Sequence, residues 1–103
     1  MRTDTIKVEQ GRVLILEFTA FDIQSHSACR FDYLTITDGD GTALMNKTCG
    51  STLPSKISSR SNLVDILFTT NHAAEKTGWS VSWRAATPGV CDFLLLTQEA
   101  LSI

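Results

Sequence analysis

Histidines, cysteines and acidic residues are the side chains of this sequence that could do chemistry. The two histidines are His26 and His72, and together with the many serines they could suggest a hydrolytic triad. Neither accompanies a nucleophile signature such as Gly-x-Ser-x-Gly. The sequence also shows no glycine-rich phosphate-binding loop and no paired general acid and base. We therefore interpret both histidines as surface-loop residues and predict that the chain is not an enzyme.

The three cysteines are Cys29, Cys49 and Cys91, and no two of them are spaced closely enough for a CxxC zinc or redox motif. One interpretation is a Cys29–Cys49 disulfide with Cys91 left over, and closing that loop would contribute about 3 kcal/mol. The other is three reduced, buried thiols of a cytosolic protein. The spacing alone leaves both interpretations open.

Charge and length exclude several classes of partner. Nine basic residues against eleven acidic ones give a net charge of −2, and the basic residues are scattered along 103 residues. A nucleic-acid or polybasic membrane surface needs clustered Lys and Arg, so we expect neither. No apolar run approaches the roughly 20 residues of a membrane span, and the N-terminus has no signal-peptide core.

Apolar residues alternate with polar ones along most of the chain, and this period-two pattern predicts strands with one buried face. The alternating runs are found at residues 6–8, 13–19, 33–37, 63–69 and 79–84. Turn residues separate them at 9–11, 38–41, 53–55 and 76–78. Several short strands at this spacing indicate an all-β antiparallel sandwich, with Trp79 and Trp83 as core residues.

Two segments need separate interpretation. Asp38-Gly39-Asp40-Gly41 lacks the further ligands of an EF-hand loop, so we predict a hairpin turn with its glycines at positive φ. The tail from Phe93 to Leu101 departs from strand periodicity and could form a helix or an extended apolar strand.

Motifs along residues 4–85 resemble those of a CUB domain in type and in order. They are Val8 to Gly11, Phe18 to Ile23, Cys29 to Tyr33, Asp38-Gly39, Cys49-Gly50, Ser59 to Val64 and Gly78-Trp79. Ser25 to Asp32 is similar to CUB modules of secreted astacin- and tolloid-type proteases and procollagen-proteinase enhancers. The resemblance implies a jelly-roll-like β-sandwich, a Cys29–Cys49 disulfide and secretion.

The resemblance also implies domain limits. A CUB module begins about two strands earlier and carries a first cysteine pair that this sequence does not contain. We therefore expect a CUB domain at residues 1–86, N-terminally truncated, and a linker or tail at residues 87–103. Such truncation would expose a sheet edge. We hypothesise that the tail from Phe93 to Leu101 fills that place or pairs with a second copy; the alternative is a disordered terminus.

Many CUB domains have a calcium site built from three acids at one loop end. Here the corresponding residues are Gln24, Asp32 and Asn71, which lowers the side-chain charge from three negative charges to one. Because calcium affinity depends on the number of charged ligands, we predict millimolar binding or none, and therefore no required cofactor. Asp22 and Glu75 could compensate. We favour a hydrogen-bonded structural role for Asp32.

The resemblance implies a non-catalytic, extracellular protein-binding module within a larger secreted protease or matrix-associated protein. The contacts would come from loops at one end of the sandwich, residues 25–32 and 70–77, with His26, Asp32, His72 and Glu75 as candidates. The alternative is a spermadhesin-like module that binds glycans without metal. Asn46-Lys47-Thr48 is an N-glycosylation sequon, credible in a secreted protein.

Overall fold

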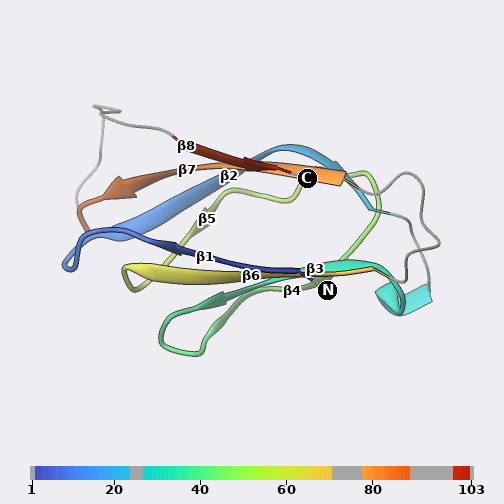
Figure 1. Ribbon diagram of the computed structural model, residues 1–103, viewed down its shortest axis with the longest axis horizontal. Helices are drawn as coiled ribbons and strands as arrows, with labels where there is room; N and C mark the ends of the chain where they lie inside the picture. Colours follow the sequence, from blue (N-terminus) through green and yellow to red (C-terminus); the bar gives the residue numbers. More distant parts are fainter. Residues whose placement is uncertain (1, 24–26, 71–77, 89–98, 103) are drawn as a thin grey trace.

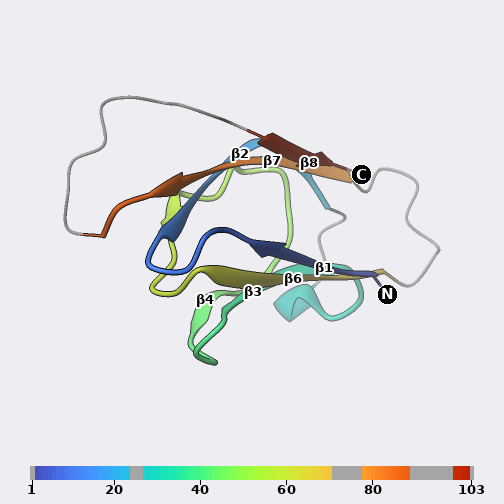
Figure 2. The ribbon, with the colours of Figure 1, turned by 60° about the vertical axis from the view of Figure 1, so that its left-hand side comes forward.

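The chain forms two antiparallel sheets, seen here in a computed structural model that describes residues 2–23, 27–70, 78–88 and 99–102. The sheets lie one above the other in both views of the ribbon (Figures 1 and 2). The first sheet contains, in spatial order, β1 (Arg2–Lys7), β6 (Leu63–Thr69), β3 (Tyr33–Asp38) and β4 (Ala43–Thr48). The second contains β5 (Ile57–Ser58), β2 (Val13–Asp22), β7 (Gly78–Ala86) and β8 (Glu99–Ser102). The predicted all-β sandwich is confirmed.

The core lies between the sheets and is filled by the apolar half of each alternating strand. In β3, Leu34 and Ile36 are fully buried while their neighbours are only partly buried. Trp79 is a core residue, as predicted, and its ring meets Phe68 edge to face at a centroid distance of 6.1 Å. Trp83 is partly buried against this core. Alternation therefore sets which face of each strand the core covers.

A β-bulge in β2 shifts which residues of this strand face the core. The register with β7 shifts between Phe18 and Ala20, so Thr19 has no directly paired residue. The extra residue brings both Phe18 and Phe21 into the core, where their rings meet edge to face at 5.5 Å. The Thr19 and Ser80 hydroxyls share a hydrogen bond of 2.7 Å beside the bulge.

Part of the C-terminal tail belongs to the second sheet. β8 pairs antiparallel with β7, from Ser80 opposite Ser102 to Trp83 opposite Glu99. Residues 99–101 of the predicted tail are therefore extended and cover the side of β7 that faces away from β2 (Figure 1). Residues 93–98 lie outside the described residues. The hypothesis that the tail fills the place of the missing first strands or pairs with a second copy therefore stays a prediction.

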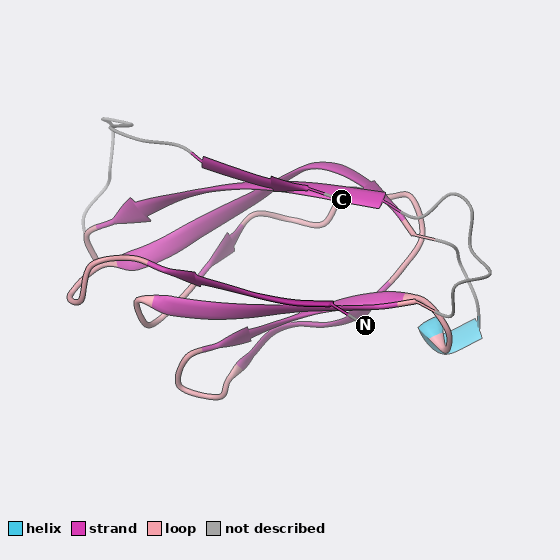
Figure 3. Cartoon of the chain, viewed as in Figure 1, coloured by secondary structure: helices cyan, strands magenta, loops and turns pink. Residues whose placement is uncertain are grey.

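Helical structure is limited, in the described part of the chain, to the 3-10 turn η1 (Ser27–Cys29), drawn in cyan in Figure 3. Consequently, none of the described residues forms a helix long and apolar enough to cross a membrane. η1 lies at the opposite end of the sandwich from the β1–β2 and β3–β4 turns (Figure 1). We call the end with η1 the loop end and the other the turn end.

Candidate functional site

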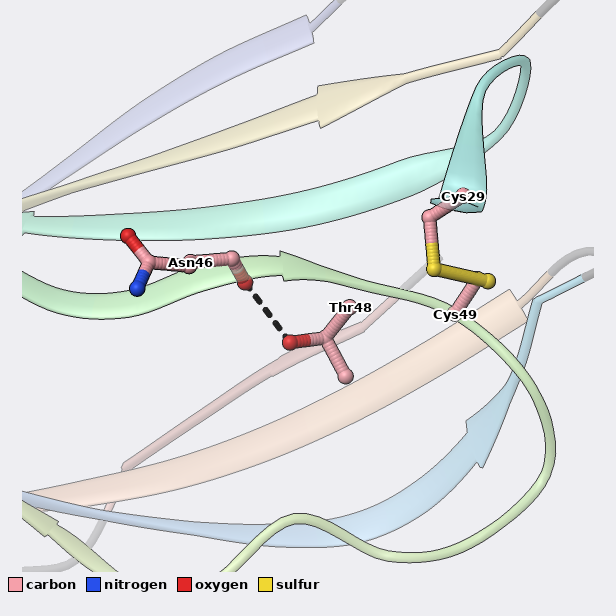
Figure 4. Close-up of a disulfide and its surroundings, with 4 residues drawn as sticks. All are labelled: Cys29, Asn46, Thr48 and Cys49. Carbon is pink, nitrogen blue, oxygen red and sulfur yellow. Dashed lines mark hydrogen bonds between the residues drawn. A yellow bond between two sulfur atoms is a disulfide. The ribbon is translucent and has the colours of Figure 1, made fainter. Parts of the chain in front are cut away.

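The loop end is closed by a disulfide between Cys29 in η1 and Cys49, which follows β4 (Figure 4). Their Cα atoms are 5.7 Å apart, within the usual range for a disulfide. The pairing that the family resemblance implied is confirmed, and the alternative of three reduced thiols is wrong for these two cysteines.

Main-chain hydrogen bonds next to the disulfide join the two sheets. The Ile23 N–H donates to the Gly50 carbonyl at 2.9 Å, and the Gly50 N–H donates to the Ile23 carbonyl at 2.8 Å. Ile23 continues from β2 of the second sheet, while Gly50 continues from β4 of the first. The covalent bond therefore ties η1, and the isolated bridge ties the end of β2, to the segment that follows β4.

The backbone beside the disulfide has an unusual conformation. Ala28 and Cys29 both adopt left-handed conformations, with φ of 58° and 48°. This region costs a non-glycine residue about 1 to 2 kcal/mol because its Cβ approaches the carbonyl oxygen. Such conformations persist where surrounding structure holds them, and they are concentrated at binding sites. Here they turn the chain sharply just before Asp32.

Asp32 and Phe31 point to opposite sides at the start of β3. Asp32 is completely buried, whereas Phe31 is 44% exposed. The alternation continues from Leu34 and Ile36, so Asp32 faces inward and Phe31 outward. Sequence reasoning singled out Asp32 but missed Phe31. Extending the period-two pattern of residues 33–37 by two residues toward the N-terminus would have placed Phe31 on the outward side.

The predicted contact residues His26, His72 and Glu75 and the predicted calcium ligands Gln24 and Asn71 lie outside the described residues. Asp22, which we considered as a compensating acid, is exposed at the end of β2 opposite Gly78. Among the described residues, no group of three or more His, Cys, Asp or Glu side chains is arranged to hold a metal ion. Two of the three predicted calcium ligands fall outside that part, so weak calcium binding stays a prediction.

A second buried aspartate, Asp38, closes the turn end. Its carboxylate accepts hydrogen bonds from the Ser61 hydroxyl and from the Arg60 N–H, the latter at 2.6 Å. Burial alone would raise the pKa of Asp38, but the bonds from Ser61, Arg60 and the Gly39 and Asp40 amides outweigh it and hold the pKa below its usual value. Asp38 is therefore an ionised structural acceptor that ties β3 to the segment before β6.

The two glycines of the β3–β4 turn serve different purposes. Gly41 has φ of +92°, as predicted, and its N–H donates to the Asp38 carbonyl at 2.9 Å. The prediction of positive φ was wrong for Gly39. A Cβ at Gly39 would lie 2.7 Å from the Ser61 hydroxyl oxygen and 3.1 Å from the Leu63 carbonyl oxygen. Gly39 is needed because the chain passes too close to β6 for any side chain.

An open groove of about 640 Å³ lies at the turn end. Its lining includes Lys7, Glu9 and Asp40, so charges of both signs face it. Asn62 forms one wall and pairs with the main chain of Val8 through two hydrogen bonds of 2.9 and 3.0 Å. The Asn62 groups already serve the fold, and the groove does not present a single charge sign.

Sequence comparison identifies relatives in several proteins. The family model for the CUB domain matches residues 4–83. Cubilin of Sus scrofa is 38% identical over 82 residues, which are 78% of this chain and 2% of cubilin. Mannan-binding lectin serine protease 1 of Homo sapiens is 38% identical over 85 residues, 80% of this chain and 12% of the protease. Astacin-like metalloendopeptidase of Gallus gallus is 36% identical over 80 residues, 75% of this chain and 20% of that enzyme.

Solved structures have the same fold. The CUB1-EGF-CUB2 domains of rat MASP-1 superpose with a TM-score of 0.71 and 34% identity, covering 80% of this chain and 30% of that one. The corresponding part of human MASP-1/3 gives a TM-score of 0.71 at 23% identity, over 84% of this chain and 35% of that one. The second similarity bears on the fold alone. The chain thus spans a small part of each of these relatives.

Proposed function

This chain belongs to the CUB domain family, and from this premise we propose that it is a non-catalytic module that binds an extracellular protein. The relatives support a role in recognition. Cubilin, a serine protease and a metalloendopeptidase have this domain in common although their names describe different activities. What a small shared module contributes to such different proteins is contact with other molecules and not the chemistry itself.

The observation that carries the proposal is the exposed Phe31 beside the disulfide of the loop end. Its ring is 44% exposed, whereas its neighbour Asp32 is completely buried. Aromatic side chains and Arg are enriched among the residues that dominate binding energy, and the adjacent Arg30 is also exposed. The disulfide and the Ile23–Gly50 bridge hold the backbone that presents them. A preorganised contact loses less entropy on binding.

The parent protein in this proposal is a larger secreted protease or matrix-associated protein, and the module acts outside the cell. The extracellular setting is consistent with the Cys29–Cys49 disulfide, because disulfides persist in oxidising compartments. His26, His72 and Glu75, which lie outside the described residues, stay candidates for further contacts. Calcium would assist weakly or not at all.

Binding of the chain to a panel of purified extracellular proteins and to a glycan array tests the proposal. We expect a protein to bind, and Phe31→Ser to weaken that binding by at least about tenfold, as the loss of an aromatic anchor does. Gln10→Ser, an exposed change at the turn end, is the matched control and should leave affinity unchanged. Binding to glycans alone would favour the metal-independent glycan-binding alternative and contradict the proposal.

A further inference from the structure

The sequon Asn46-Lys47-Thr48 lies in β4, which is the outermost strand of the first sheet. Among the described residues, no strand pairs with the side of β4 that faces away from β3. An edge strand presents main-chain N–H and C=O groups that can pair with a strand of another molecule. A device that protects this edge is therefore expected somewhere along β4.

A β-bulge lies at Asn46 and Lys47 on this edge. Leu34 pairs with Thr48 and Ile36 pairs with Met45, so the single residue between Leu34 and Ile36 faces two residues of β4, Asn46 and Lys47. Met45 and Thr48 are partly buried, while Asn46 is exposed. The bulge bends the strand and leaves two consecutive residues, Asn46 and Lys47, both exposed. The asparagine therefore has room for a bulky substituent that the folded domain can accommodate.

The local contacts leave the Asn46 carboxamide accessible. The Thr48 hydroxyl donates to the main-chain carbonyl of Asn46 at 2.6 Å, so it does not engage the side chain (Figure 4). The Asn46 side chain points away from Thr48 and from the Cys29–Cys49 disulfide. Lys47 lies over the Tyr33 ring, with its ammonium nitrogen 4.6 Å from the ring centroid, and so occupies the neighbouring surface.

We propose that Asn46 carries an N-linked glycan and that this glycan shields the β4 edge from strand addition. The proposal rests on the proposed function only in requiring entry into the secretory pathway. The donor is an oligosaccharide joined to a lipid diphosphate. The Asn46 amide nitrogen bonds to the anomeric carbon of the first sugar, the anomeric C–O bond breaks, the lipid diphosphate leaves and the amide releases one proton.

Expression of the full chain behind a cleavable secretion signal in cultured animal cells tests the modification. We expect one discrete mass shift that an amide-cleaving glycosidase removes, with mass spectrometry locating the cleaved glycan on the Asn46 peptide. Asn46→Gln and Thr48→Ala should abolish the shift, and Thr48→Ser should retain it. Asn46→Gln keeps the Thr48 hydroxyl bond, whereas Thr48→Ala loses it, so a shared loss of the glycan is not a folding effect.

The state of the Cys29–Cys49 disulfide distinguishes a failure of this proposal from a failure of the proposed function. A secreted chain with an intact Cys29–Cys49 bond and no glycan would overturn the proposed modification and leave the binding module standing. A chain that reaches the secretory lumen with neither glycan nor disulfide would overturn both proposals.

Sedimentation velocity tests the shielding. We expect the enzymatically deglycosylated chain, Asn46→Gln and Thr48→Ala to self-associate at concentrations at least about tenfold lower than the glycosylated chain. Thr48→Ser should behave as the glycosylated chain does. Adding Ala43→Lys to Asn46→Gln places a further charge at an exposed position of β4 and should restore the monomer if association uses this edge. Equal self-association of the glycosylated and deglycosylated chains would overturn the shielding.

Discussion

The two ends of β3 carry two buried aspartates that the molecule uses in different ways. Asp32 and Asp38 face the same side of the strand and are 0% and 2% exposed. At the turn end, Asp38 is held by donors from the segment before β6, and its surroundings serve the fold. At the loop end, Asp32 lies beside a disulfide and an exposed aromatic ring. Residue type and burial alone therefore do not distinguish the proposed binding site from a purely structural one.

The means of closure also differ between the two ends. The turn end is held by hydrogen bonds among close neighbours in the fold, whereas the loop end depends on a covalent bond and an isolated bridge between sheets. A covalent bond allows a segment to remain in place with few other contacts. Under the proposed function, the exposed Arg30 and Phe31 beside this covalent bond are the residues that meet a partner.

Removing the disulfide should have the largest effect on stability and should affect the loop end first. Cys29→Ala with Cys49→Ala opens a loop with a sequence separation of 20 and should cost about 3 kcal/mol. Amide hydrogen exchange should accelerate at Ile23 and Gly50 and change less at Gly39 and Gly41. Uniform acceleration at both ends would contradict separate means of closure.

Removing the Asp38 carboxylate should weaken the turn end by a smaller amount. Asp38→Ala leaves the Ser61 hydroxyl and the Arg60 N–H without their charged acceptor, at a cost of about 2 kcal/mol. Denaturant unfolding measures this loss. The matched control is Asp40→Ala in the same turn, because exposed Asp40 accepts one bond, from the Thr42 N–H at 2.8 Å. Equal losses for the two variants would show that burial of Asp38 adds nothing.

Low pH should remove the stability that the Asp38 carboxylate contributes. The pKa of Asp38 is lowered in the folded chain below the unfolded value of about 3.9, so the unfolded state binds the proton more readily. The stability that Asp38 contributes is complete above the unfolded pKa and is lost as the pH falls through the folded pKa. Asp38→Asn should flatten this part of the curve of unfolding free energy against pH, and an unchanged curve would refute the role of Asp38.

Calcium should have the smallest effect and should act, if anywhere, at the loop end. With a Kd of about 1 mM, adding 1 mM calcium would stabilise the fold by only about 0.4 kcal/mol. Titration calorimetry should therefore give millimolar affinity or no heat, and Asp32→Asn should abolish any binding that is seen. Micromolar affinity would mean that the loss of two acids has been compensated.

Much of this protein follows from its sequence alone. Alternation around residues such as Leu34, Ile36 and Val64 determined the strands and their inner faces, because period two is a local property of extended backbone. Motif order indicated the family, and Asp38-Gly39-Asp40-Gly41 indicated a turn. The same alternation would have indicated the outward direction of Phe31 had it been extended to that residue, but Phe31 was missed.

The tertiary structure decided what depends on contacts between distant segments. Spacing left the Cys29–Cys49 pairing open, since only the packing of η1 against the end of β4 brings the two thiols together. The bulge at Thr19, the steric need for Gly39 and the pairing of β8 with β7 likewise depend on a neighbouring strand far away in sequence. A local pattern selects a strand and its buried face, but pairing partners are chosen by the energy of the whole sandwich.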